Sequence, residues 1–195
     1  MRIISGKFKG KKLIQPLDKN TRPLKDITKE SIFNLIVHSK LIDVNFEKSI
    51  ILDLFAGSGS FGIECLSRYS RHVTFIENYK PAVNTLKKNI NLLNLKDNYK
   101  IIEKDVFDKN TLNYIDKKFD IIFLDPPYRE EKTKELFNII FENKILDQKG
   151  FIIIHRNKKS PDIFPDNFEI IDIRNYGISK IFFFKVKIIF LLFLF

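Results

Sequence analysis

The sequence predicts an α/β fold built on a mostly parallel sheet that is covered by helices. From about residue 49 onward, short apolar runs alternate with amphipathic stretches, which is the pattern of consecutive β-α-β units. Two further strand-like runs, separated by the turn-forming segment 175–177, indicate a hairpin after these units. Five alternating units followed by a hairpin describe a seven-stranded sheet whose last strand is antiparallel to the rest.

The predicted strands are rich in Ile, Val, Leu and Phe, and the first four each end at or beside an acidic residue. Apolar residues at helical spacing predict the helices, whereas 106–118 is a loose polar connection. In chain order, the expected strands cover 49–55, 72–77, 100–104, 119–125, 150–155, 168–174 and 180–187, and the expected crossover helices cover 61–69, 80–95 and 131–143.

The first 48 residues differ from this pattern. Residues 2–15 indicate two short strands about a Gly6–Gly10 turn, and a helix is predicted at 27–39. The expected hairpin collects five cations in a small space, namely Arg2, Lys7, Lys9, Lys11 and Lys12. We therefore divide the chain into a basic N-terminal appendage (1–48), a main α/β domain (49–187) and an apolar tail (188–195).

The charge balance suits a polyanionic partner. Lys and Arg number 34 against 24 Asp and Glu, which gives a formal net charge of +10. Cations that displace condensed counterions gain affinity for a nucleic acid, although the same charge could be solvated surface in a chain of biased composition.

The remaining composition bears on the compartment. A single cysteine, Cys65, excludes an internal disulfide or a cysteine metal cluster and fits a reducing cytoplasm. Charges near the N-terminus argue against a signal peptide. Lys185 and Lys187 interrupt the apolar C-terminal stretch, so no membrane span is expected.

A glycine-rich segment, 53–62, lies where the first predicted strand turns into a helix. Its glycine spacing fits a dinucleotide fingerprint, but a pyrophosphate there would be repelled by Asp53. S-adenosylmethionine has no phosphate and carries an ammonium and a sulfonium group, so an acidic loop entrance favours it. We predict that this cofactor contacts Asp53, Phe55, Ala56, Gly57, Ser58 and Gly59.

Two more acids follow the next strands. Glu77 ends the second strand, where a carboxylate can accept hydrogen bonds from both ribose hydroxyls. Asp105 follows the third strand and could accept from the adenine amino group, with Val106 or Phe107 against the ring. Each acid taken alone is more simply a helix cap or a solvated strand end. Three acids at successive strand ends favour a cofactor site.

The segment Asp125-Pro126-Pro127-Tyr128 ends the fourth strand, beside the expected cofactor crevice. The amino nitrogen of a nucleic-acid base is a poor nucleophile because its lone pair is delocalised into the ring. A carboxylate from Asp125 and a carbonyl from Pro126 can accept both amino hydrogens and direct the lone pair at the methyl group. Pro126 and Pro127 stiffen the backbone, and Tyr128 offers a face for stacking an extruded base. The alternative is a Pro-Pro turn that merely ends a strand.

With these residues, the chain resembles the bacterial family of 16S ribosomal RNA guanine-N2 methyltransferases that modify guanine 966. The similarity spans about residues 1–187 and includes six segments: 2–13, 21–23, 30–35, 53–62, 125–128 and 176–184. The family implies a Rossmann-like methyltransferase sheet over 49–187 and a 16S ribosomal RNA or small-subunit substrate. It also implies that Arg22 and the basic hairpin lie near the cofactor mouth and contact the RNA backbone.

Two alternatives remain. One is an adenine-N6 methyltransferase acting on nucleic acid, which normally needs a dedicated DNA-reading insertion, and the other is a non-catalytic RNA-binding assembly factor. His38, His72 and His155 have no ligand spacing and are expected to be ordinary surface or packing residues, so no metal is predicted. We expect a cytoplasmic monomer.

Overall fold

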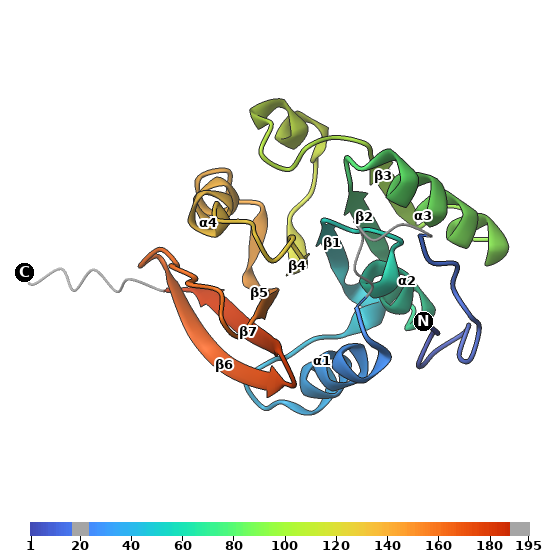
Figure 1. The fold of residues 1–195 in the computed structure, drawn as a ribbon, viewed down its shortest axis with the longest axis horizontal. Coiled ribbons are helices and arrows are strands. Elements are labelled where there is room, and N and C mark those ends of the chain that lie inside the picture. Colours follow the sequence, from blue (N-terminus) through green and yellow to red (C-terminus); the bar gives the residue numbers. More distant parts are fainter. Residues whose placement is uncertain (17–23, 188–195) are drawn as a thin grey trace, which may run out of the picture.

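The computed structural model describes residues 1–16 and 24–187. Its centre is a seven-stranded sheet of order β3-β2-β1-β4-β5-β7-β6 (Figure 1). Strands β1 to β5 pair in parallel, and β7 runs antiparallel to both β5 and β6. The strands are β1 (Ile50–Leu54), β2 (His72–Ile76), β3 (Tyr99–Ile102), β4 (Phe119–Leu124), β5 (Leu146–Asn157), β6 (Phe168–Tyr176) and β7 (Ser179–Val186). The predicted α/β class and the antiparallel last strand are confirmed.

Helices cover both faces of the sheet because its central strands are buried on both sides. Helices α1 (Asp26–His38), α2 (Ser60–Ser67) and α3 (Lys80–Leu92) pack into one apolar cluster, whereas α4 (Thr133–Glu142) packs into the other. Alternate residues of one strand supply the two clusters, as Ile121 and Phe123 face the first and Ile122 and Leu124 the second. Short 3-10 helices lie at Phe46–Lys48 and Lys109–Tyr114.

Aromatic rings fill the two cores. On the first face, Phe61 of α2 stacks on Phe123 of β4 with 4.0 Å between ring centroids. On the second, Phe137 of α4 meets Phe184 of β7 edge to face at 4.9 Å. Such pairs add about 0.5–1.5 kcal/mol each beyond the area they bury. The first contact fixes the start of α2 against the carboxyl end of β4, which is where the site lies.

The N-terminal segment differs from the expected pair of strands. Arg2 and Lys12 form a single antiparallel bridge, and the turn between them does not continue as a ladder. The backbone groups of this turn bind α2 instead. Lys7 N donates to the carbonyl of Ser67 at 2.7 Å, and Ile4 N donates to Glu64 at 2.8 Å. The competing bonds to α2 explain why the hairpin is reduced to one bridge.

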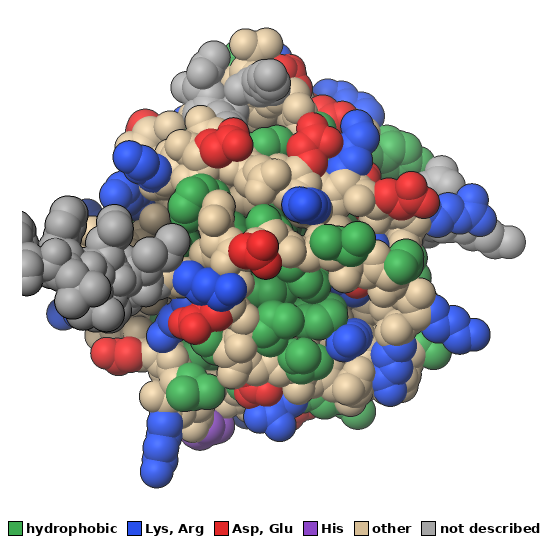
Figure 2. All heavy atoms as spheres, turned by 90° about the vertical axis from the view of Figure 1, so that its left-hand side faces the viewer, with side chains coloured by type: hydrophobic (Ala, Val, Ile, Leu, Met, Phe, Trp, Pro, Cys, Tyr) green, Lys and Arg blue, Asp and Glu red, His purple; other side chains and the backbone are tan. Residues whose placement is uncertain are grey.

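The face on which β6, β7 and α4 lie is shown in Figure 2. Hydrophobic side chains gather near its centre and are surrounded by charged ones. Edge strand β6 contributes exposed apolar side chains here, since Ile170 is 47% exposed and Ile173 is 41% exposed.

Within residues 1–16 and 24–187, no helix is long and apolar enough to cross a membrane. Arg22 and the apolar tail 188–195 lie outside the described residues. The division into segments 1–48, 49–187 and 188–195 stays a prediction. The structure does place Ile3, Phe8 and Leu13 in the same apolar cluster as the central strands.

Candidate active site

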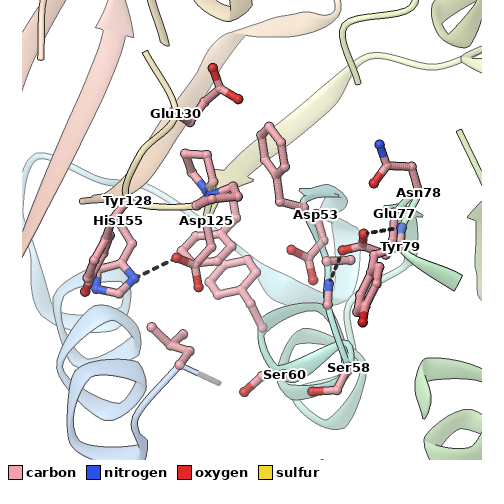
Figure 3. A pocket seen from close by; sticks show the side chains of 18 of the residues that line it. Asp53, Ser58, Ser60, Glu77, Asn78, Tyr79, Asp125, Tyr128, Glu130 and His155 are labelled. Carbon is pink, nitrogen blue, oxygen red and sulfur yellow. Dashed lines mark hydrogen bonds and ion pairs between the residues drawn. The ribbon is translucent and has the colours of Figure 1, made fainter. Parts of the chain in front are cut away.

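The candidate site is a cavity of about 630 Å³ at the carboxyl ends of the central strands. The strand order reverses between β1 and β4, and the crevice at such a point is the usual ligand site of an open α/β sheet. Figure 3 shows Asp53, Glu77, Asp125 and His155 converging on it. Further lining residues come from the glycine-rich loop and the Asp-Pro-Pro-Tyr segment, namely Phe55, Ala56, Gly57, Ser58, Pro126, Pro127 and Tyr128.

The glycine-rich loop is shaped by close packing. Gly59 precedes α2 with a φ of +84°, a left-handed conformation that side chains rarely adopt. Gly62 lies so close to β2 that an added Cβ would be 2.3 Å from the ring of Phe75. These constraints bring the start of α2 against the sheet and keep the turn at 55–58 on the wall of the cavity.

Asp53 lies at the base of this loop and is only 1% exposed. Its Oδ2 accepts a hydrogen bond of 2.9 Å from the backbone N–H of Gly62. Burial raises the pKa of the Asp53 carboxyl well above its ordinary value, and the charges of Asp125 and Glu77 raise it further. A cation in the cavity would favour the ionised carboxylate.

Glu77 holds the loop from the end of β2. Its Oε2 accepts from the N–H of Gly57 at 2.8 Å and its Oε1 accepts from Tyr79 N at 2.8 Å. Each carboxylate oxygen has a second lone pair, so both can still accept a ligand hydroxyl. The carboxylate of Glu77 is therefore fixed at the cavity by the backbone N–H groups of Gly57 and Tyr79.

The residues after β3 correct one expectation. Asp105 lines the cavity, and its Oδ1 accepts from Phe107 N at 2.9 Å. Phe107 lies on the cavity wall with its ring centroid 6.0 Å from that of Phe55. Val106, which we predicted as a cofactor contact, is instead 6% exposed and belongs to the apolar core. The backbone turn held by Asp105 presents the neighbouring aromatic ring.

Asp125 lies across the cavity from the glycine-rich loop. Its Oδ1 is 2.8 Å from Nδ1 of His155, and its side chain is 20% exposed (Figure 3). The ring of Tyr128 meets the ring of His155 edge to face at 6.0 Å. Pro126 follows Asp125 on the wall of the same cavity. The Asp125 carboxylate and the Pro126 carbonyl both follow the end of β4, and their role as acceptors stays a prediction.

His155 is a site residue that sequence reasoning missed. We expected it to have an ordinary surface or packing role, but it lines the cavity and contacts Asp125. The reason is the register of β4 and β5, in which Leu124 pairs with Ile154, so the next residue of each strand is adjacent. A register argument applied to the two predicted strand ends could have found this contact.

The predicted RNA-contacting residues do not gather at the cavity. Arg2, Lys7, Lys9, Lys11 and Lys12 are all exposed, but their turn is bound at Ser67, where α2 ends. The cavity lies at the opposite end of that helix. From the described N-terminal segment, Pro16 and Leu24 line it. Arg22 lies outside the described residues, and the expectation that it and the basic hairpin contact RNA near the cavity mouth stays a prediction.

Lys29 has a structural position. Its side chain is fully buried, with Nζ donating to the carbonyl of Arg2 at 2.7 Å and lying 3.6 Å from Glu64. Burial lowers the pKa of the Lys29 ammonium, and Glu64 opposes that shift.

Within residues 1–16 and 24–187, no group of three or more His, Cys, Asp or Glu side chains is placed to bind a metal.

The sheet order, the glycine-rich loop and the acidic cavity define a Rossmann-like methyltransferase. The chain belongs to the family described as Conserved hypothetical protein 95, which matches residues 1–185.

Similar proteins cover nearly the whole chain. The "Ribosomal RNA small subunit methyltransferase D" of Buchnera aphidicola (subsp. Acyrthosiphon pisum) is 37% identical over 172 residues, 86% of this chain and 84% of that protein. The protein of the same description from Haemophilus influenzae is 32% identical over 183 residues, 91% of this chain and 90% of that protein. A crystal structure of a Haemophilus influenzae protein is 31% identical with a TM-score of 0.74, over 95% of this chain and 97% of that one.

Proposed function

We propose that this chain transfers a methyl group from S-adenosylmethionine to the exocyclic N2 amino group of a guanine in 16S ribosomal RNA. The family resemblance points to guanine 966. The observation that carries the reaction type is the pair of acceptors at the end of β4, the Asp125 carboxylate and the Pro126 carbonyl, on the cavity wall opposite the glycine-rich loop. The descriptions of the relatives as small-subunit ribosomal RNA methyltransferases support the substrate.

The cavity fits the proposed cofactor in charge and size. Among the described residues that line it, five carboxyl side chains face a single guanidinium, that of Arg129. That balance suits a ligand with an ammonium and a sulfonium group, and about 630 Å³ lies within the usual range for small-molecule sites. We assign Asp53 and the 55–59 loop to the methionine part, Glu77 to the ribose, and Asp105 with Phe107 to the adenine.

When bound, S-adenosylmethionine supplies an electrophilic methyl group on a sulfonium. The residues of this chain prepare the acceptor. Asp125 and Pro126 accept the two amino hydrogens, which draws the nitrogen toward tetrahedral geometry and aims its lone pair. Tyr128 supplies a ring on which the extruded base can stack. Asp125 would accept the proton that the amino nitrogen loses when its bond to the methyl carbon forms and the bond between that carbon and sulfur breaks.

The test is methyl transfer from radiolabelled S-adenosylmethionine to small ribosomal subunits that lack the modification, with the labelled nucleoside identified by mass. We expect N2-methylguanosine from the wild type and none from Asp125→Ala, while Asp125→Ala still binds the cofactor. Label on adenine or on DNA would overturn the guanine assignment. No label on any substrate would favour the non-catalytic alternative.

A further inference from the structure

Two consecutive residues at the end of β5 hold the Asp-Pro-Pro-Tyr segment from opposite sides. His155 contacts the carboxylate of Asp125 through Nδ1 at 2.8 Å (Figure 3). Arg156 donates from Nη1 to the carbonyl of Pro127 at 3.1 Å and from Nη2 to the carbonyl of Glu130 at 2.7 Å. Successive side chains of a strand point to opposite faces, which is how neighbours in sequence reach both the side chain and the backbone of this segment.

Both contacts are removed from water. The side chains of His155 and Arg156 are 5% and 3% exposed. The charge of Arg156 is balanced by Asp162, whose Oδ1 lies 2.6 Å from Nε and whose side chain is 4% exposed. Burying an ion pair costs desolvation energy, and an apolar pair could fill the same volume. The guanidinium therefore does more than fill space, because each of its two terminal nitrogens donates to a carbonyl of the loop.

The contact to Asp125 has a defined polarity. An ionised carboxylate only accepts hydrogen bonds, so at 2.8 Å the imidazole must carry its proton on Nδ1. That donor fixes the rotation of the carboxylate and leaves its other oxygen for the substrate amino group. The carbonyl of Pro126 is oriented in turn, because ring closure sets φ of Pro127 and Arg156 holds the next carbonyl.

We propose that His155 and Arg156 are positioning residues for methyl transfer, His155 by orienting the carboxylate of Asp125 and Arg156 by orienting the Pro126–Pro127 backbone. This inference rests on the proposed function, since it assigns both residues to the same two acceptors. Neither residue is assigned a contact with the cofactor. Their loss should therefore lower kcat and leave cofactor affinity unchanged, because misplacing an acceptor by about 1 Å can reduce the rate roughly 10²-fold.

The side chains that can replace His155 make a sharp test. Asparagine places an N–H close to the position of Nδ1, glutamine places it close to the position of Nε2, and phenylalanine keeps the ring without a donor. We expect kcat to fall roughly 10²-fold in His155→Phe and His155→Gln and to recover at least tenfold in His155→Asn. The exposed His38, changed to Asn, is the matched control. Equal loss in all three variants, or no loss in His155→Phe, would overturn the role of the Nδ1 donor.

For Arg156 the variant is Arg156→Lys, which keeps the charge but replaces the planar fork of three donor nitrogens with a single ammonium nitrogen. We expect a lower kcat with an unchanged KM for RNA, and no effect of the matched change Arg174→Lys on exposed β6. An unchanged kcat would overturn the role of Arg156.

A measurement independent of activity separates this inference from the proposed function. Nitrogen-15 NMR of the imidazole in the wild-type protein reports which ring nitrogen carries the proton. We expect Nδ1–H at neutral to alkaline pH, and a switch to the other tautomer in Asp125→Ala. An unprotonated Nδ1 of His155 in the wild type would overturn the positioning contact, whatever substrate the enzyme methylates. A wild type that labels no guanine would instead overturn the proposed function and leave the NMR result standing.

Discussion

The carboxylate of Asp53 accepts a hydrogen bond of 2.9 Å from the backbone of Gly62, inside the first turn of α2. This contact buries a charge beside the proposed cofactor, and burial raises the pKa of Asp53 well above its ordinary value. A cationic ligand binds the ionised form better, so at pH values below the raised pKa binding must release a proton. We predict that the Kd for S-adenosylmethionine rises as pH falls, by up to about tenfold per unit.

Calorimetry across pH, in buffers of different ionisation enthalpy, measures both the Kd and the proton released. Asp53→Asn should bind more weakly at high pH and lose most of the pH dependence. A wild-type Kd that is flat over the accessible pH range would contradict the assignment of Asp53 to the cationic part of the cofactor.

We also predict that replacing Asp53 stabilises the folded protein against heat. Because the folded pKa of Asp53 is raised, the folded protein retains a proton that the unfolded chain releases above about pH 3.8. Stability from this group is therefore lost as pH rises from that value through the raised pKa. Asp53→Asn, which keeps the acceptor for Gly62 but cannot ionise, should raise the Tm of the ligand-free protein at neutral pH. An increase of about 2–4 °C corresponds to about 1 kcal/mol in a chain of this size.

Thermal melts of both proteins at several pH values test this reasoning. The difference in Tm should shrink toward zero in acid, where the wild-type carboxyl is protonated in both states. A difference that is independent of pH would point to packing instead of ionisation.

We predict that replacing Glu64 causes a large loss of stability. Its buried carboxylate accepts from Ile4 N, Ser5 N and Arg68 Nε and lies 3.6 Å from the buried ammonium of Lys29. Glu64→Gln removes the buried counter-charge beside Lys29, and we expect a cost of about 3–5 kcal/mol in the free energy of unfolding. Denaturant titration measures it.

The matched partner is Lys29→Met. If the charge of Lys29 causes the loss, the double variant should be more stable than the sum of the single effects by about 1–3 kcal/mol. Strict additivity would show that the hydrogen bonds to the N-terminal backbone matter more than the charge pair.

Much of the fold could be predicted because the core strands are buried on both faces and appear as continuous apolar runs. The helices also begin and end within about three residues of their expected positions. Strand β5 is longer than predicted. Its first part was missed because Asp147, Gln148 and Lys149 are polar and interrupt the apolar run. The 3-10 helix Lys109–Tyr114 was missed because such short turns have no apolar period.

The site was predictable where it depends on strand ends and not where it depends on register or loop conformation. Asp53, Glu77 and Asp125 reach one cavity because parallel strands share a carboxyl edge. His155 lies 30 residues from its partner, and only the pairing of β4 with β5 brings the two together. Between Val106 and Phe107 no pattern could decide, because a loop has no period that fixes which side chain faces inward.

We predict that a side chain at Gly62 disturbs the packing of α2 against β2. An alanine Cβ there would be 2.3 Å from Phe75 and 2.8 Å from Val73, closer than atoms can approach, so the helix or the ring must move. We expect Gly62→Ala to cost about 1–3 kcal/mol and to weaken cofactor binding, because the N–H of Gly62 holds Asp53. Adding Phe75→Leu makes room, and the double variant should recover part of both losses. If Gly62→Ala bound S-adenosylmethionine as tightly as the wild type, the packing of α2 would not determine the conformation of the cofactor loop.

The basic turn predicts an effect on RNA affinity that is separate from the cofactor site. Exposed Lys7, Lys9, Lys11 and Lys12 lie by the end of α2 that is remote from the cavity. Replacing all four with Ala should raise KM for the RNA, leave the Kd for S-adenosylmethionine unchanged, and reduce the salt dependence of RNA binding by about 0.7–0.9 in slope for each phosphate that is no longer neutralised. An unchanged slope would show that these lysines are only solvated surface. Changing four exposed lysines elsewhere, Lys144, Lys149, Lys158 and Lys159, is the control for net charge.

The attachment of the N-terminal turn to α2 has a consequence for how the chain folds during synthesis. The bonds from Ile4, Ser5 and Phe8 reach partners 59–60 residues further along the chain. The turn emerges from the ribosome before α2 and stays without its docking partner until α2 has been made. Closing a loop of that length costs entropy before its contacts repay it, so this contact should form late. Until then the lysine-rich turn remains an unfolded cationic arm beside the polyanionic ribosome on which it is made.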